Sequence, residues 1–295
     1  MARTQSKTTL AHASRQTPKP TMKPAATRKP SVSQAIAVPL SFILVVAAIL
    51  AFAPIPHPPN HVKIPIFGTS RHFKTGEHFL HNRVKNTPSW LYLTLHAGPS
   101  MAWSVLMPLQ HVAWIRRNVP AFHRTSGYII MATSLLLALT GLGLLSDYKD
   151  SPHPPFFSLH TLNGNSPIPW PTFRLTTALL AVPFLYSLYR AAMAGTSKQY
   201  ELHRYWATVH TIFGYAIGLE RLLLLGTYPL GWVAALYAKI DLREILGYED
   251  TIASLAEAEH EVFALVNIGV LALILFWLRY EFGGKGSPLA RVKKE

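Results

Sequence analysis

The sequence predicts an all-α, polytopic membrane protein in which six helices cross the bilayer. Hydrophobic residues make up 49% of the 295 positions and charged residues only 14%, whereas a soluble domain carries about 25% charged residues. The charged residues also gather in tails and loops, which leaves six apolar runs. We expect spans two to five to form a four-helix core.

The net charge of +14 has two readings. A basic balance is typical of nucleic-acid-binding proteins, but it also follows from the preference of Lys and Arg for the cytoplasmic side of membrane spans. We favour the second reading, with the lipid bilayer as partner and no nucleic acid. A membrane-protein partner or a homo-oligomer is left open. The chain has no cysteine, which excludes disulfides, thiolate metal sites and a cysteine nucleophile.

The chain begins with a basic tail and one span. Residues 1–34 hold seven Lys or Arg and no acid, and their prolines forbid a continuous helix, so we expect a disordered cytoplasmic tail. Residues 35–88 start with the apolar run Ala35 to Ala53, which is just long enough to span. The polar loop after it has five histidines. Their spacings match no compact metal pattern, and no metal site is predicted.

Residues 89–226 form the predicted core. Its four spans are Leu91 to Trp114, Tyr128 to Leu145, Phe173 to Tyr189, and Tyr205 to Leu225. Pro183 predicts a kink in the third of these. Gly127, Ser134 and Gly141 share one helical face, a seam of small residues that favours close helix packing in lipid.

The last part of the chain holds a short apolar segment and a final span. Within residues 227–261, the run Leu230 to Ile240 is too short to cross a bilayer, so we expect an interfacial segment followed by an acidic loop. Residues 262–295 contain the sixth span, Val262 to Leu278, with Asn267 as its one strongly polar residue, and then a basic tail.

Loop charges predict the orientation. Both tails and the loops 115–127 and 190–204 are net basic, whereas 147–173 and 226–261 are neutral to acidic. This alternation places both termini in the cytoplasm. The loop 54–88 is the exception, because it is basic on the predicted outer side. Nothing in the sequence indicates which membrane holds the protein.

Ionisable residues inside spans are costly, so they usually face the interior of a bundle and have partners. At about 100° per residue, His203, His210 and Arg221 fall on one face of the fifth span. Gly214 shares that face and would let a neighbouring helix approach. With the predicted topology, the inner end gathers His111, His123, His203, His210 and Gln110. On the outer side, His96, Glu220 and Arg221 could meet if the second and fifth spans are neighbours.

One interpretation of the inner histidines is a b-type haem. Bis-imidazole ligation needs two histidines at similar depth on facing helices. His123 or His111 with His203 or His210 would supply them. The protein would then move electrons within or across the membrane.

Two other interpretations are open. The first is a proton or small-solute path through a transporter, in which His96, His210, Glu220 and Arg221 relay or bind. The second is a structural or accessory subunit, in which His-Arg pairs cap span ends and buried polar pairs fix helix register. Motifs of soluble enzymes such as GxSxG, the P-loop and HExxH are absent. No catalytic residue is therefore assigned, and enzymatic activity is left open.

Several polar residues of the core also stand in a recognisable order. They are His96, Pro108-Leu109-Gln110, His123-Arg124 with Gly127, His203-Arg204 with Trp206, and Arg221. In these features, from Leu91 to Leu225, the chain resembles the predicted membrane proteins grouped as domain of unknown function 2306. The resemblance implies a multi-span helical bundle and points to His96, Gln110, His123, His203 and Arg221. It implies no reaction, and His111, His210 and Glu220 lie outside the pattern.

Overall fold

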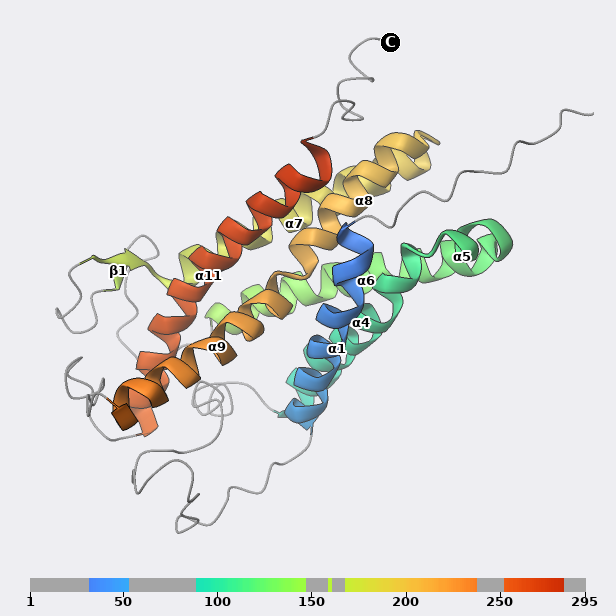
Figure 1. Cartoon of the computed structure of the whole chain (residues 1–295). Helices are drawn as coiled ribbons and strands as arrows, with labels where there is room; N and C mark the ends of the chain where they lie inside the picture. The colour runs from blue at the N-terminus through green and yellow to red at the C-terminus, as the bar shows by residue number, and fades with distance from the viewer. Residues whose placement is uncertain (1–31, 53–88, 147–158, 161–167, 238–251, 284–295) are drawn as a thin grey trace, which may run out of the picture. The chain divides into compact units, whose positions relative to one another are not determined.

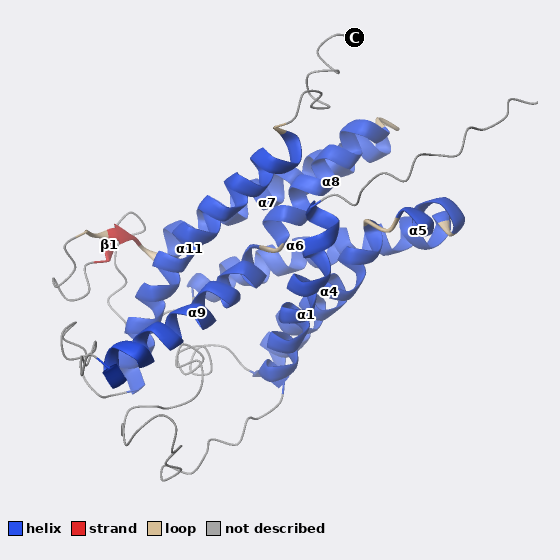
Figure 2. Cartoon of the chain, in the orientation of Figure 1, coloured by secondary structure: helices blue, strands red, loops and turns tan. Residues whose placement is uncertain are grey.

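The computed structural model describes residues 32–52, 89–146, 159–160, 168–237 and 252–283, which belong to the unit Ser31–Glu295. Figure 2 shows that nearly all of this part is helical. The basic tail up to residue 31, the loop 54–88 and the acidic loop up to residue 251 lie outside the described residues. The predicted all-α class is confirmed for the part that the structure describes.

Three described helices are long and apolar enough to cross a membrane: Pro120–Leu144, Phe173–Thr196 and Glu261–Phe282. They lie within α6 (Pro120–Ser146), α7 (Phe173–Thr196) and α11 (Ile252–Phe282). This result supports an integral membrane protein. Large apolar side chains such as Leu139 and Val182 point outward from these helices, where they would contact lipid rather than water.

The first helix, α1 (Val32–Phe52), covers the predicted first span as far as Phe52 and includes the last three residues of the predicted tail. Its buried side chains, Ala37, Leu40, Leu44 and Ala48, recur every three or four residues and therefore form one helical face. That face packs against the second and fifth predicted spans. The apolar part of α1, Ala35–Ile49, is shorter than the three helices that are long enough to cross a membrane.

The second predicted span is not a uniform helix. It consists of α3 (Ser89–Tyr92), the π-helical turn η1 (Leu93–Ala97) and α4 (Gly98–Gln110). Pro99 lies two residues after the end of the π turn. Because proline cannot donate a backbone hydrogen bond, it disturbs the regular α-helical ladder. The helix also ends at Gln110 rather than at Trp114, because Val112 is extended and starts a separate short helix, α5 (Ala113–Asn118).

The third and fourth spans are longer than predicted. Helix α6 begins at Pro120 instead of Tyr128, since proline is well suited to the first turn of a helix. Helix α7 runs to Thr196 instead of Tyr189 and contains Pro183. The Thr172 hydroxyl accepts a hydrogen bond from the Leu175 amide and so caps the start of α7. Before α7, β1 (Leu159–His160) pairs antiparallel with β2 (Trp170–Pro171), which the sequence did not predict.

The fifth predicted span is broken. Helix α8 (Tyr200–Gly214) is followed by one non-helical residue, Tyr215, and α9 (Ala216–Tyr237) starts immediately after it. Figure 1 shows the short interruption between α8 and α9. The predicted span from Tyr205 to Leu225 is therefore interrupted at one residue, Tyr215, whose amide still donates to the Thr211 carbonyl over 3.1 Å. The predicted interfacial segment from residue 230 is also continuous with α9 as far as Tyr237.

The first and the last described helices meet at one end of the bundle. The Ser33 amide and hydroxyl donate to Glu281 Oε2 over 3.3 and 3.1 Å, and Trp277 Nε1 donates to Ser33 Oγ over 3.2 Å. The start of α1 thus lies beside the end of α11. Tyr205, near the start of α8, packs on Phe282 with ring centroids 4.6 Å apart. We call this end of the bundle the inner end, after the cytoplasmic side on which the sequence predicts it.

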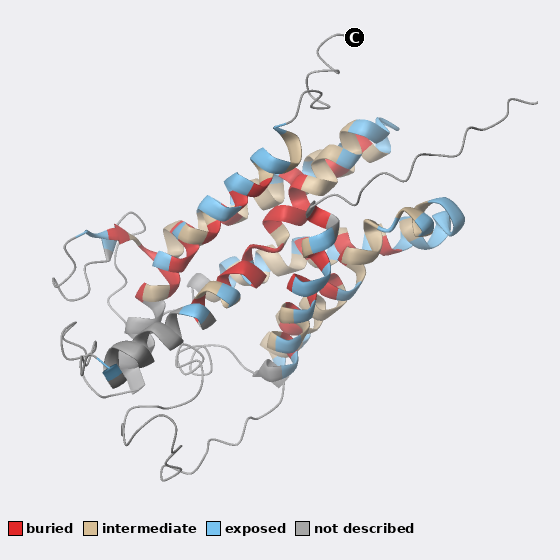
Figure 3. Cartoon of the chain, in the orientation of Figure 1, coloured by how far each residue is buried: buried red, intermediate tan, exposed pale blue. Residues whose placement is uncertain are grey.

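The core lies where the helices face one another, as the buried positions in Figure 3 show. Its largest fully buried side chains are Trp103, Tyr215 and Phe263. Trp103 and Tyr215 join the second predicted span to the break in the fifth, with ring centroids 5.2 Å apart. The second and fifth spans are therefore neighbours at this level, as the sequence analysis required for its polar cluster.

Candidate functional site

His210 lies at the centre of a buried hydrogen-bond chain that joins four helices. Trp103 Nε1 donates to Ser134 Oγ over 2.9 Å, and Ser134 Oγ lies 2.9 Å from His210 Nε2. His210 Nδ1 lies 3.1 Å from the Phe184 carbonyl oxygen. Because a carbonyl only accepts, Nδ1 carries the proton. A neutral imidazole that accepts the Ser134 proton at Nε2 satisfies every group in the chain.

The space around His210 depends on Gly214. A Cβ atom on Gly214 would overlap the indole ring of Trp103 and come within 3.3 Å of Phe184. The Phe184 ring in turn stacks on the His210 imidazole, with centroids 4.4 Å apart and planes 28° apart. The prediction that Gly214 lets a neighbouring helix approach is confirmed, and the neighbour is α4.

Tyr215 forms the break between α8 and α9. Its backbone angles, φ −80° and ψ 2°, leave helical geometry, and its side chain has no exposed surface. The phenol oxygen lies 2.7 Å from Ser41 Oγ of α1. A polar side chain is therefore buried at the point where the helix is interrupted.

Glu220 and Arg221 lie on α9, beyond the break. Glu220 is 3% exposed. The guanidinium carbon of Arg221 lies 5.0 Å from the centroid of the Phe263 ring of α11, which is a cation–π contact. Arg221 therefore faces α11, which the sequence analysis did not consider.

One helical turn after Phe263, α11 carries the buried Asn267. Its side-chain nitrogen donates to the hydroxyl oxygens of Thr176 and Thr177 of α7 over 3.2 and 3.4 Å. Its side-chain oxygen is buried and has no hydrogen-bond partner in the described part of the chain. An unpaired buried acceptor costs free energy, so this oxygen is a candidate contact for a water or a solute.

His96 lies in the π turn. Its Nδ1 atom lies 2.8 Å from Thr140 Oγ1 of α6, and the Thr140 hydroxyl donates to the Leu136 carbonyl over 2.7 Å. The imidazole therefore donates to Thr140. Tyr92 stacks on the same imidazole with centroids 5.4 Å apart. His96 thus contacts α6, and Arg221 contacts α11.

Gln110 and His111 close α4 at the inner end. Gln110 Nε2 donates to Ser126 Oγ of α6 over 2.6 Å. His111 Nε2 lies 3.0 Å from Thr211 Oγ1 of α8, and the Thr211 hydroxyl donates to the Ala207 carbonyl over 2.8 Å. His111 Nε2 is therefore the donor to Thr211. Both side chains connect helices.

His123 and His203 occupy equivalent positions, because each is the fourth residue of its helix, α6 or α8. His203 Nδ1 lies 2.8 Å from the Ala191 carbonyl oxygen of α7. Gly195 permits this approach, since a Cβ there would come within 3.1 Å of Nδ1. His123 Nδ1 is buried and has no hydrogen-bond partner among the described residues.

Two arginines complete what we call the inner basic cluster, which comprises His111, Arg116, His123, His203 and Arg204. Burial and the charge of Arg204 lower the pKa of Arg116, with a further contribution from Arg117. The charge of Arg116 also reaches His111 and His123, and that of His203 reaches His123. The charges named here are all basic.

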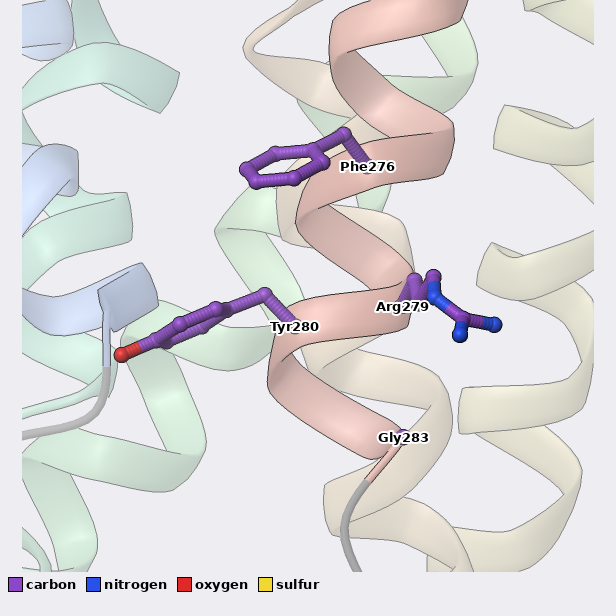
Figure 4. Close-up of a pocket in the computed structure, with 4 residues that line it drawn as sticks. All are labelled: Phe276, Arg279, Tyr280 and Gly283. Carbon is purple, nitrogen blue, oxygen red and sulfur yellow. The ribbon is translucent and has the colours of Figure 1, made fainter.

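A surface pocket lies at the end of α11. It has a volume of about 340 Å³ and is lined by Phe276, Arg279, Tyr280 and Gly283. Figure 4 shows the two rings on one side of the helix and the guanidinium group pointing away from them. Because all four residues come from one helix and none was predicted as a site residue, the pocket does not coincide with the polar groups described above.

The four candidate haem ligands differ in the hydrogen bonds that their imidazole nitrogens make. His210 uses both nitrogens and His111 uses Nε2 in hydrogen bonds to the protein. His203 instead donates Nδ1–H to a backbone carbonyl, which is how the protein usually orients a metal-ligating histidine. His203, with His123 as partner, therefore fits haem ligation better than His111 or His210.

Comparison of the chain with family models, with curated proteins and with solved structures gives no match. The resemblance to domain of unknown function 2306 stays a prediction. The partners missed by the sequence analysis are mostly hydroxyl groups within apolar helices, namely Ser41, Ser134, Thr140, Thr176 and Thr211. Ser and Thr in apolar runs are the signal that could have indicated them.

Proposed function

We propose that the chain is a six-span membrane protein with cytoplasmic termini and a four-helix core of spans two to five, and that it moves protons, alone or with a small solute, along α8 and α9. An even number of crossings is supported by the contact between Ser33 and Glu281, because it brings the first and last helices together at one end. Membership of the family that the sequence resembles is part of this proposal.

The observation that carries the proposal is the break at Tyr215 in a helix with buried ionisable groups on both sides. His210 precedes the break and Glu220 follows it, and each is 3% exposed. Burying such groups at membrane depth is costly, and they usually mark ion or substrate paths. Transporters often bind substrate and coupling ions where a membrane helix is discontinuous.

Four ionisable groups of α8 and α9 recur at short intervals along the chain. His203, His210, Tyr215 and Glu220 are separated by seven, five and five residues, or about 10, 7 and 7 Å along a helix. Hydroxyl groups lie beside two of them, Ser134 at His210 and Ser41 at Tyr215. With intervening waters, these groups would form a proton path from the inner end to the outer half.

Proton flux into proteoliposomes tests the proposal. A potassium diffusion potential drives protons inward, and an enclosed pH-sensitive dye reports them. We expect flux above that of protein-free liposomes, and a reduction of about a hundredfold for Glu220→Gln, as for loss of a proton-transferring side chain. Glu201→Gln is the matched control, because Glu201 is an exposed residue in the first turn of α8. Wild-type flux equal to the lipid background, with and without candidate solutes, would contradict the proposal.

A b-type haem electron carrier is the second candidate, favoured by the hydrogen bond from His203 to the Ala191 carbonyl. His203 and His123 would hold the haem, which would supply one-electron chemistry, and Gly195 would keep His203 oriented. An oxidised and a dithionite-reduced absorption spectrum of the protein expressed with ample haem decides between the candidates. Loss of a Soret band in both His123→Ala and His203→Ala would support ligation, and a featureless wild-type spectrum would end this candidate.

A further inference from the structure

The inner basic cluster is assembled from four parts of the chain. His111 follows α4, Arg116 lies on α5, His123 on α6, and His203 with Arg204 on α8. The hydrogen bond from His111 to Thr211 holds the end of α4 against α8. Helix α5 packs against both α4 and α6. Residues about 90 positions apart in the sequence therefore converge at one end of the bundle.

The cluster is electrostatically unfavourable by itself. The N-terminal end of a helix carries a partial positive charge, which disfavours cations and favours anions. Here two helices, α6 and α8, each carry a His-Arg pair in their first turns. Arg116 adds a partly buried charge next to them. This arrangement stores repulsion that a bound anion would relieve.

One polar atom of the cluster has no partner. His123 Nδ1 is buried without a hydrogen bond among the described residues. A buried polar group left unpaired costs about 1–3 kcal/mol. The oxygen of a bound ligand would satisfy this nitrogen.

We propose that the inner basic cluster binds an oxyanion of the phosphate type. Guanidinium groups match the oxygens of phosphate with two parallel donors, and helix N-termini are common phosphate sites. The phosphate could belong to a soluble compound or to an anionic lipid headgroup, since basic sites at the cytoplasmic ends of membrane helices bind such lipids. The proposal does not depend on the proton path along α8 and α9.

A simpler account is that these residues only follow the general preference of Lys and Arg for the cytoplasmic side. Under that account, the arginines at the inner end are interchangeable. A specific site requires instead that Arg116 and Arg204 matter more than Arg117, which is exposed and lies beside Arg116 on α5. Arg117→Gln is therefore the charge-matched control.

The experiment measures thermal unfolding of the full chain in two settings. In neutral detergent, inorganic phosphate is titrated against chloride at equal ionic strength. In nanodiscs, phosphatidylcholine alone is compared with phosphatidylcholine containing phosphatidic acid. Wild type, Arg116→Gln, Arg204→Gln, His123→Gln and Arg117→Gln are compared. Arg204 is exposed, so its variant is expected to fold even if Arg116→Gln does not.

We expect phosphate or phosphatidic acid to raise the unfolding midpoint saturably in wild type. Loss of one charged donor should weaken the apparent affinity roughly tenfold, whereas Arg117→Gln should bind like wild type. A response to inorganic phosphate identifies a soluble ligand, and a response to phosphatidic acid alone identifies a lipid headgroup. No response to either probe, or an equal loss in Arg117→Gln, would overturn the proposal. Proton flux measured on the same variants reports separately on the proposed function.

Discussion

At the scale of single residues, the bundle centre is organised by a histidine that is fully hydrogen-bonded. His210 accepts from Ser134 and donates to the Phe184 carbonyl, while Trp103 donates to Ser134. In a medium without water, each of these groups would be costly if left alone. This chain of hydrogen bonds therefore fixes how α4, α6, α7 and α8 pack against one another, independently of any further role of His210.

Replacement of Ser134 by alanine should destabilise the protein. The change removes the acceptor of the Trp103 N–H and the donor to His210 Nε2 at once, so we expect a loss of about 1–3 kcal/mol. The measurement is the midpoint of thermal unfolding in detergent. Thr133→Ala is the control, because among the described residues Thr133 bonds only to carbonyls of its own helix. Equal midpoints for the two variants would show that the chain of hydrogen bonds contributes nothing.

Replacement of Gly214 by alanine should destabilise by overpacking. The new methyl group would overlap the Trp103 indole, and overpacking of a close-packed core costs about 1–3 kcal/mol. The double variant Gly214→Ala with Trp103→Phe should lose less than the sum of the single changes, because the two sites are in contact. Gly226→Ala serves as control, since a Cβ there meets no atom of the described residues within 4 Å. A strictly additive result would place the strain elsewhere.

At the scale of helices, two irregularities carry the ionisable groups. The π turn of the second span holds His96, and the break in the fifth span holds Tyr215 between His210 and Glu220. Single π turns occur frequently at functional sites. Both irregularities lie next to hydroxyl partners on other helices, Thr140 and Ser41. The regular helices position the π turn and the break, and we expect proton or solute binding at these two irregularities.

The hydrogen bond between Tyr215 and Ser41 should hold the break against α1. A double-mutant cycle of Tyr215→Phe and Ser41→Ala isolates it, and we expect a coupling energy of about 0.6–1.7 kcal/mol, as for other hydrogen bonds between membrane helices. Proton flux of Tyr215→Phe should also fall if the phenol is part of the path. Zero coupling with unchanged flux would make the 2.7 Å contact unimportant to both.

At the scale of the whole molecule, topology decides which groups face the cytoplasm. The contact of α1 with the end of α11 and the packing of Tyr205 on Phe282 bring three helix ends together. The inner basic cluster takes its residues from α4, α5, α6 and α8. If the inner end is cytoplasmic, this cluster is open to soluble phosphates and to the anionic inner leaflet.

The absence of cysteine makes this topology directly testable. Single cysteines at two exposed positions, Ser197 between α7 and α8 and Ile168 before β2, are treated with a membrane-impermeant maleimide in sealed vesicles. Because α7 separates the two positions and is long enough to span, they should be labelled from opposite sides. We expect Ser197→Cys to react from the cytoplasmic side. Labelling of both from one side would contradict the six-span arrangement.

The sequence by itself determined the helical class, the membrane setting and the close approach at Gly214. These follow from hydrophobicity, charge placement and side-chain size, which act locally along the chain. The tertiary structure decided the break at Tyr215, the turn of Arg221 towards Phe263 of α11 and the partners of His96 and His210. Helical periodicity indicates which face a side chain is on, but its partner depends on which helix packs there. A buried polar group therefore acquires its role only when the bundle assembles around it.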